Sequence, residues 1–141
     1  MSGKLFSPTV VGATALSNRI VMAPMTRSRA IGNVANEMIA AYYAQRADAG
    51  LIITEGISPS PDGLGYSRIP GLFNQTQALS WKPVTDGVHA RGGHMIAQFM
   101  HTGRVGHPLN LPEGGRVIGP SAVAAPGQMW TDQQQMQPHP V

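Results

Sequence analysis

The sequence predicts an α/β fold built around a parallel β-sheet, and three observations support this prediction. Short, nearly continuous apolar runs occur at residues 20–23, 51–53 and 95–97. Segments with helical periodicity separate these runs, and glycines lie where each segment meets the next run. A strand–helix–strand–helix–strand order is typical of parallel strands joined by right-handed crossovers.

The three apolar runs predict strands near residues 19–25, 51–55 and 94–99. Apolar and polar residues do not alternate within the runs, as they would in a strand with one face in water. Continuous apolar runs of this length are typical of strands covered on both faces of a parallel sheet. We therefore expect all three strands to be buried on both faces.

The first helix is predicted over residues 36–49, and Gly50 is expected to end it directly before the second strand. A glycine at this point can adopt the backbone conformation that commonly terminates helices. The apolar residues that recur at helical spacing in this segment are Met38, Ile39, Tyr42, Tyr43 and Ala47.

The second helix is predicted over residues 77–91, with Leu79, Val84 and Val88 as its buried stripe. Pro83 lies inside this segment. Because proline lacks an N–H group and suits the first turn of a helix, we expect Pro83 to divide the segment into a first turn and a restarted helix.

The segment 102–141 is predicted to be irregular, because glycine and proline are frequent in it and periodicity is weak. Its glutamine-rich end, residues 133–141, is predicted to be an exposed tail. A long structureless segment in a compact domain is usually functional or awaits a partner. The 141 residues fit one domain.

Composition argues against several classes of protein. Charged residues make up 12% of the chain, the net charge is +3, and no basic run exists, so a nucleic-acid-binding surface is not expected. The chain has no cysteine for disulfides or thiolate catalysis, and its five histidines lack the tight spacing of a metal site. No apolar run is long enough for a membrane span, and the N-terminus is unlike a signal peptide. We expect a cytoplasmic protein without a metal.

Polar or backbone-exposing residues lie at the carboxyl end of each predicted strand, where parallel α/β folds bind ligands. Thr26 follows the first strand, Gly56 the second, and Gln98 belongs to the third. Together they suit a planar, polar heterocycle. Taken singly, each residue has an alternative interpretation as a strand cap or turn former.

Several segments resemble the old yellow enzyme family in the same order along the chain. They are NRIVMAPMTRSR (18–29), YAQRADAGLIITEG (43–56), WKPVTDGVHARGG (81–93), HTGR (101–104) and GPSA (119–122). The resemblance implies a TIM (β/α)8 barrel of which this chain supplies about three β/α units, the N-terminal part. Such barrels typically need about 250 residues. The missing strands are expected on another chain or segment, with a second polypeptide as the favoured partner.

The resemblance also implies an FMN site. Pro24 and Met25 would lie against the flavin ring, and the Thr26 hydroxyl would bond the flavin carbonyl beside the redox-active nitrogen. Gly56 would bring its backbone close to the pyrimidine ring, and the Gln98 amide would pair with its edge. Thr26 thus tunes the flavin, whereas the proton donor is expected outside this chain.

Two further residues are implied to line the substrate pocket. Tyr66 falls where the family places an aromatic residue, although local packing in a loop is an alternative. Met100 stands where relatives often carry tryptophan, so a wider pocket is expected.

The implied reaction is reduction of an activated alkene, such as an enone, enal, maleimide or nitroalkene. NADPH or NADH would reduce FMN, leave, and be replaced by the alkene in a ping-pong sequence. A non-flavin TIM-barrel enzyme, an inactive truncated fragment and a non-enzymatic interaction module are the alternatives.

Overall fold

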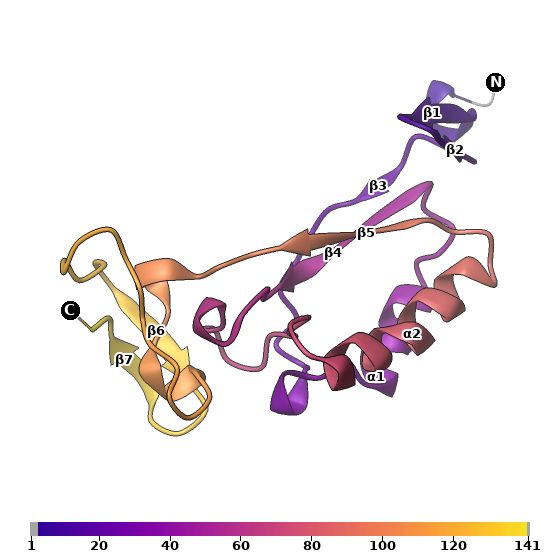
Figure 1. The fold of residues 1–141 in the computed structure, drawn as a ribbon. Helices are drawn as coiled ribbons and strands as arrows, with labels where there is room; N and C mark the ends of the chain where they lie inside the picture. The colour runs from indigo at the N-terminus through magenta and orange to yellow at the C-terminus, as the bar shows by residue number, and fades with distance from the viewer. Residues whose placement is uncertain (1–2, 141) are drawn as a thin grey trace.

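The computed structural model describes residues 3–140 and contains a three-stranded parallel sheet in the order β3-β4-β5 (Figure 1). The strands are β3 (Val21–Met22), β4 (Leu51–Ile57) and β5 (Met95–Phe99). The predicted parallel α/β arrangement is therefore confirmed. The first strand is much shorter than predicted, because Pro24 has no N–H group with which to extend the ladder.

Two helices pack together on one side of the sheet (Figure 1). Helix α1 spans Glu37–Ala44, and the Asn36 side chain caps it by accepting a hydrogen bond from the Ile39 N–H at 3.1 Å. This helix ends five residues before the predicted boundary, so Gly50 does not terminate it. Gly50 is instead required by a close approach, because the Asn18 carbonyl occupies the place of a side-chain Cβ.

Helix α2 spans Gln75–His89 and runs through Pro83 without a break, so the predicted division is wrong. Pro83 cannot donate to the Leu79 carbonyl one turn earlier. Leu79 is 61% exposed, and its carbonyl can be hydrated at little cost. The prediction that Leu79 belongs to the buried stripe is therefore also wrong. Trp81 takes this role together with Val84 and Val88.

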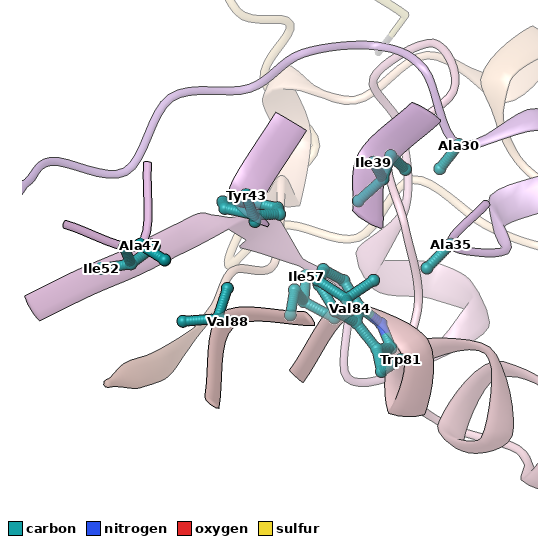
Figure 2. Close-up of a cluster of buried hydrophobic side chains, with 10 residues drawn as sticks. All are labelled: Ala30, Ala35, Ile39, Tyr43, Ala47, Ile52, Ile57, Trp81, Val84 and Val88. Atoms are coloured by element: carbon teal, nitrogen blue, oxygen red, sulfur yellow. The ribbon is translucent and has the colours of Figure 1, made fainter. Parts of the chain in front are cut away.

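The core lies between the two helices and β4 (Figure 2). Tyr43 of α1 and Val84 of α2 are completely buried against Ile52 of β4, which is 0% exposed. The Tyr43 and Trp81 rings lie 6.4 Å apart at an angle of 45°. The full cluster consists of Ala30, Ala35, Ile39, Tyr43, Ala47, Ile52, Ile57, Trp81, Val84 and Val88.

Only β4 is buried along its length, which corrects the prediction that all three strands are covered on both faces. In β3, Val21 is 47% exposed, and in β5, Ile96 and Phe99 are 52% and 56% exposed. Strand β4 has a neighbour on each side as well as helices on one face, whereas β3 and β5 form the edges of the sheet. Continuous apolar runs therefore did not distinguish a central strand from an edge strand.

Two antiparallel hairpins lie at opposite ends of the molecule (Figure 1). One joins β1 (Thr9–Val11) to β2 (Thr14–Leu16) near the N-terminus. The other joins β6 (Gln128–Thr131) to β7 (Gln135–Pro138), within the segment predicted to be irregular. Short 3-10 helices cover Lys4–Phe6, Ile31–Asn33, Pro61–Gly63, Gly103–Val105 and Pro108–Asn110.

The predicted tail over 133–141 is largely exposed in its described part, as expected, but residues 135–138 form strand β7 rather than an irregular tail. The turn is closed by Thr131, whose hydroxyl donates to the Gln135 carbonyl at 3.0 Å and accepts from the Gln134 N–H at 3.1 Å. The Asn110 amide anchors the hairpin through the Trp130 carbonyl at 2.8 Å. The backbone ladder of this hairpin is supplemented by side-chain hydrogen bonds, and its glutamine-rich sequence carries little strand signal.

Candidate functional site

The structure brings the three predicted polar positions to one end of the parallel sheet. Gly56 of β4 is the direct register partner of Gln98 of β5. On the other side of β4, the Arg27 N–H donates to the Glu55 carboxylate at 3.2 Å, so the peptide that follows Thr26 is fixed next to Gly56. The three segments therefore meet across the central strand.

The side chains at this end of the sheet suit a flat ligand with a polar edge. Thr26 and Gln98 are exposed, and neither side chain is hydrogen bonded within the described chain, whereas the Gln98 N–H is held by Thr54. Met25 directly precedes Thr26 and Phe99 directly follows Gln98, and each of these apolar residues is about half exposed. A hydroxyl, a carboxamide and apolar surface are groups that can hold a flavin ring and pair with its carbonyl and N–H edge. The residues present therefore fit FMN.

Gly56 is buried, and a Cβ at this position would meet the Met100 side chain. The nearest atoms would be the Met100 Cε at 2.7 Å, the Sδ at 2.8 Å and the Cβ at 3.0 Å. Real Cβ atoms essentially never come closer than 3.0 Å to another heavy atom. The structure thus places Met100 directly over Gly56, which sequence reasoning did not predict.

Tyr66 is half-buried on the loop between β4 and α2. This loop is tied to the chain that follows β5, because the Thr102 hydroxyl donates to the Leu64 carbonyl at 2.5 Å and the His107 N–H donates to the Gly65 carbonyl at 3.1 Å. The loop therefore has a fixed position. Whether Tyr66 contacts a substrate stays a prediction.

Pro24 and Met25 lie on the segment that leaves β3. Pro24 is half-buried, and Met25 is 45% exposed. Met25 also lines an apolar hollow beside the edge strand β3, together with Ile20 and Met22. The structure thus places the Met25 side chain at the open edge of the sheet.

Sequence reasoning missed Glu55 and Tyr43, which support the site from behind. Burial raises the pKa of the Glu55 carboxyl above its ordinary value, and burial likewise raises the pKa of the Tyr43 hydroxyl. The Tyr43 oxygen accepts a hydrogen bond from the Glu55 N–H at 2.7 Å, and its hydroxyl donates to a Glu55 carboxylate oxygen at 3.5 Å. A carboxylate inside the apolar run LIITEGI was the signal that could have identified the pair.

Two other kinds of feature are absent from residues 3–140. No group of three or more His, Cys, Asp or Glu side chains is arranged to hold a metal ion there. Neither described helix has the length and apolar character needed to cross a bilayer.

A model of the NADH:flavin oxidoreductase / NADH oxidase family matches residues 4–139. The 12-oxophytodienoate reductase 7 of Oryza sativa subsp. japonica is 47% identical over 115 residues, which are 81% of this chain and 29% of that protein. A chanoclavine-I aldehyde reductase of Penicillium roqueforti is 44% identical over 126 residues, which are 86% of this chain and 34% of that protein.

Solved structures give a consistent result. A morphinone reductase variant in complex with tetrahydroNAD superposes with a TM-score of 0.90 at 39% identity, over 98% of this chain and 39% of that chain. The old yellow enzyme homologue from Zymomonas mobilis also superposes with a TM-score of 0.90, at 42% identity over 96% of this chain and 38% of that chain. The chain thus spans between 29% and 39% of the length of these relatives and structures.

Proposed function

The chain belongs to the NADH:flavin oxidoreductase / NADH oxidase family, and we propose that it supplies the FMN-facing N-terminal part of an ene-reductase. Membership confirms the resemblance to old yellow enzymes, and the structural similarity confirms that the fold is part of a (β/α)8 barrel. The proposed activity is reduction of the C=C bond of an activated alkene by NADH or NADPH.

The observation that carries this proposal is the meeting of Thr26, Gly56 and Gln98 at one end of the sheet. FMN, when bound, supplies the hydride chemistry. The Thr26 hydroxyl would donate a hydrogen bond to a ligand carbonyl, which stabilises negative charge on that oxygen. Gln98 would orient the ligand with one donor and one acceptor. The Pro24–Met25 segment would cover the ring and limit its exposure to water.

We propose a chemical class for the reductant and another for the oxidising substrate. The morphinone reductase structure contains tetrahydroNAD, which favours a nicotinamide cofactor as reductant for this chain as well. The names of the relatives describe reductases of an oxophytodienoate and of an aldehyde, and both fit an activated carbonyl compound. Met100 and Tyr66 would border the substrate, with the flexible thioether of Met100 giving the pocket some adaptability.

The remaining barrel strands would pair with the two edges of this sheet. Val21 on β3 and Ile96 on β5 are about half exposed, and both belong to strands with one free edge within the described residues. Such edges are normally covered by further strands. These strands would belong to the same protein or to a second polypeptide, and they would supply the proton donor.

The test is a visible absorption spectrum of the purified protein, with intact-mass analysis of every polypeptide in it. We expect a bound-flavin band that bleaches anaerobically with NADH or NADPH and returns on addition of an activated alkene such as N-ethylmaleimide. The intact masses decide whether one or two polypeptides carry the barrel. A protein that does not bind added FMN would refute the proposal.

A pair of variants tests the residues. Thr26→Ala and Gln98→Ala should each weaken FMN binding by about three- to tenfold, the effect of losing one hydrogen bond. Thr85→Ala is the matched control, because its hydroxyl bonds the Lys82 carbonyl at 3.0 Å within α2, far along the chain from the site. Equal FMN affinity in all three variants would show that neither Thr26 nor Gln98 holds the flavin.

A further inference from the structure

We propose that a β-bulge at Thr54–Glu55 in β4 positions both sides of the flavin-facing surface, with Thr54 holding the Gln98 backbone and Glu55 holding the Arg27 backbone. This inference deepens the proposed function and rests on it. Thr54 and Glu55 would be positioning residues that act through their neighbours.

The bulge is evident from the register between β4 and β5. Ile53 pairs with Ile96, and Gly56 pairs with Gln98. Two residues of β4, Thr54 and Glu55, therefore lie opposite a single residue of β5. Such an insertion is rare between parallel strands, and bulges often lie next to active sites, where they redirect side chains.

The bulge changes which face of the sheet each side chain occupies. In a regular strand, residues an even number apart share a face. Ile52 and Ile57 are five residues apart, yet both belong to the core beneath the helices and are at most 1% exposed. Glu55 also reaches this side, where it meets Tyr43 of α1. The extra residue therefore turns Glu55 toward α1 and leaves Gly56 facing Met100.

Thr54 takes the place of a missing ladder partner. Its hydroxyl, in a side chain that is only 3% exposed, accepts a hydrogen bond from the Gln98 N–H at 3.0 Å. The same hydroxyl donates to the Glu55 carbonyl at 2.9 Å. Without it, the Gln98 N–H would lose its acceptor at the point where β5 carries its flavin-facing carboxamide.

Glu55 acts on the opposite side of β4. Its carboxylate is 1% exposed and accepts the Arg27 N–H at 3.2 Å. Tyr43, which is completely buried, bonds both the backbone and the carboxylate of Glu55. The peptide after Thr26 is thereby linked to the packed core through two side chains.

These contacts share one property that points to positioning rather than to general stability. Thr54 bonds the backbone of Gln98, whose side chain faces the proposed ligand. Glu55 bonds the backbone of Arg27, the residue directly after Thr26. Thr26 and Gln98 have no side-chain hydrogen bonds of their own within residues 3–140, so the bulge fixes their backbones and leaves their functional groups free.

The test uses two pairs of variants in the FMN-loaded protein. Thr54→Val and Glu55→Leu remove the acceptors at nearly constant volume, whereas Thr54→Ser and Glu55→Gln keep an acceptor oxygen. Hydrogen exchange should become about tenfold faster at the Gln98 amide in Thr54→Val and at the Arg27 amide in Glu55→Leu, as expected for the loss of one hydrogen bond. The Ser and Gln variants should resemble wild type.

The midpoint potential of the bound flavin separates positioning from a purely structural role. We expect Glu55→Leu to shift it by about 30 mV, which corresponds to a tenfold change in the ratio of affinities for the two redox states of a two-electron couple. Glu55→Gln should restore the wild-type value. Faster amide exchange without any shift of the potential or of the FMN affinity would overturn the positioning role.

The outcomes also separate this inference from the proposed function. Protection of the Arg27 and Gln98 amides that persists in Glu55→Leu and Thr54→Val would overturn the inference, even if FMN binds normally. A wild-type protein without FMN would overturn the proposed function. In that case, loss of protection confined to these two amides in Glu55→Leu and Thr54→Val would still support the bulge as the device that fixes their backbones.

Discussion

Gly56→Ala is expected to destabilise the protein by about 1–3 kcal/mol, the usual cost of an extra group in a packed site. The new Cβ would lie 2.7–3.0 Å from three atoms of Met100. The Cε and Sδ atoms can rotate away, whereas the Met100 Cβ is fixed by the backbone. Part of the cost therefore comes from displacing the thioether and part from a small movement of the backbone.

A double-mutant cycle with Met100→Ala tests this reasoning. Truncating Met100 removes the Sδ and Cε contacts, so Gly56→Ala should cost about 1 kcal/mol less in the Met100→Ala background. The free energy of unfolding would be measured by urea denaturation of all four proteins. An identical cost in both backgrounds would refute the claim that Met100 occupies the space over Gly56.

Gly87→Ala is the matched control for the same chemical change. Gly87 lies inside α2, and its new Cβ would meet only the Ala44 Cβ at an ordinary 3.6 Å. Because alanine is the better helix former, this variant should be more stable than wild type by up to about 1 kcal/mol. Gly56→Ala and Gly87→Ala should therefore change stability in opposite directions.

Three further predictions concern polar groups. Asn18→Ala should cost about 1–3 kcal/mol in urea unfolding, because its side-chain oxygen accepts the Gly50 N–H at 2.8 Å and a buried donor would be left unpaired. Burial raises the pKa of Glu55, so the folded protein holds this proton above pH 4.5 where the unfolded chain releases it, and stability falls as the pH rises through that window. Glu55→Gln should make this decline in stability above pH 4.5 shallower, and an unchanged slope in urea unfolding would contradict this. Asn110→Ala should accelerate amide exchange in the β6–β7 hairpin by about tenfold, since the bond to the Trp130 carbonyl is lost.

The sequence allowed the parallel order of the sheet to be predicted, because glycines and helical periodicity separate its apolar runs. The sequence did not show which strands have exposed faces and which are buried on both faces. Val21 and Ile52 belong to similar apolar runs, yet one is 47% exposed and the other is fully buried. The difference arises from strand order, which depends on long-range pairing and leaves no local signal. The prediction that Pro83 divides the second helix was wrong for a related reason, because it also depended on exposure. Leu79 is exposed, so water can satisfy the carbonyl that Pro83 leaves without a donor.

The candidate site was predictable where single residue types carry the chemistry. Thr26, Gly56 and Gln98 were identified from strand ends and family motifs, and the structure places them at one end of the sheet. The supporting residues were not predictable from those motifs. Whether Glu55 faces the helices depends on a one-residue bulge, and a bulge is visible only when the partner strand is known.

The two sides of the site depend on β4 to different degrees. Strand β5 pairs with β4 through four residues, whereas β3 pairs through Val21 and Met22 alone. Beyond Met22, the chain that carries Thr26 has left the ladder, and the Arg27–Glu55 hydrogen bond is its nearest connection to the central strand. Gln98 would keep most of its ladder bonds if Thr54 were lost. The Thr26 side of the site should therefore be the more sensitive one, and substitution of Glu55 should perturb a bound flavin more than substitution of Thr54.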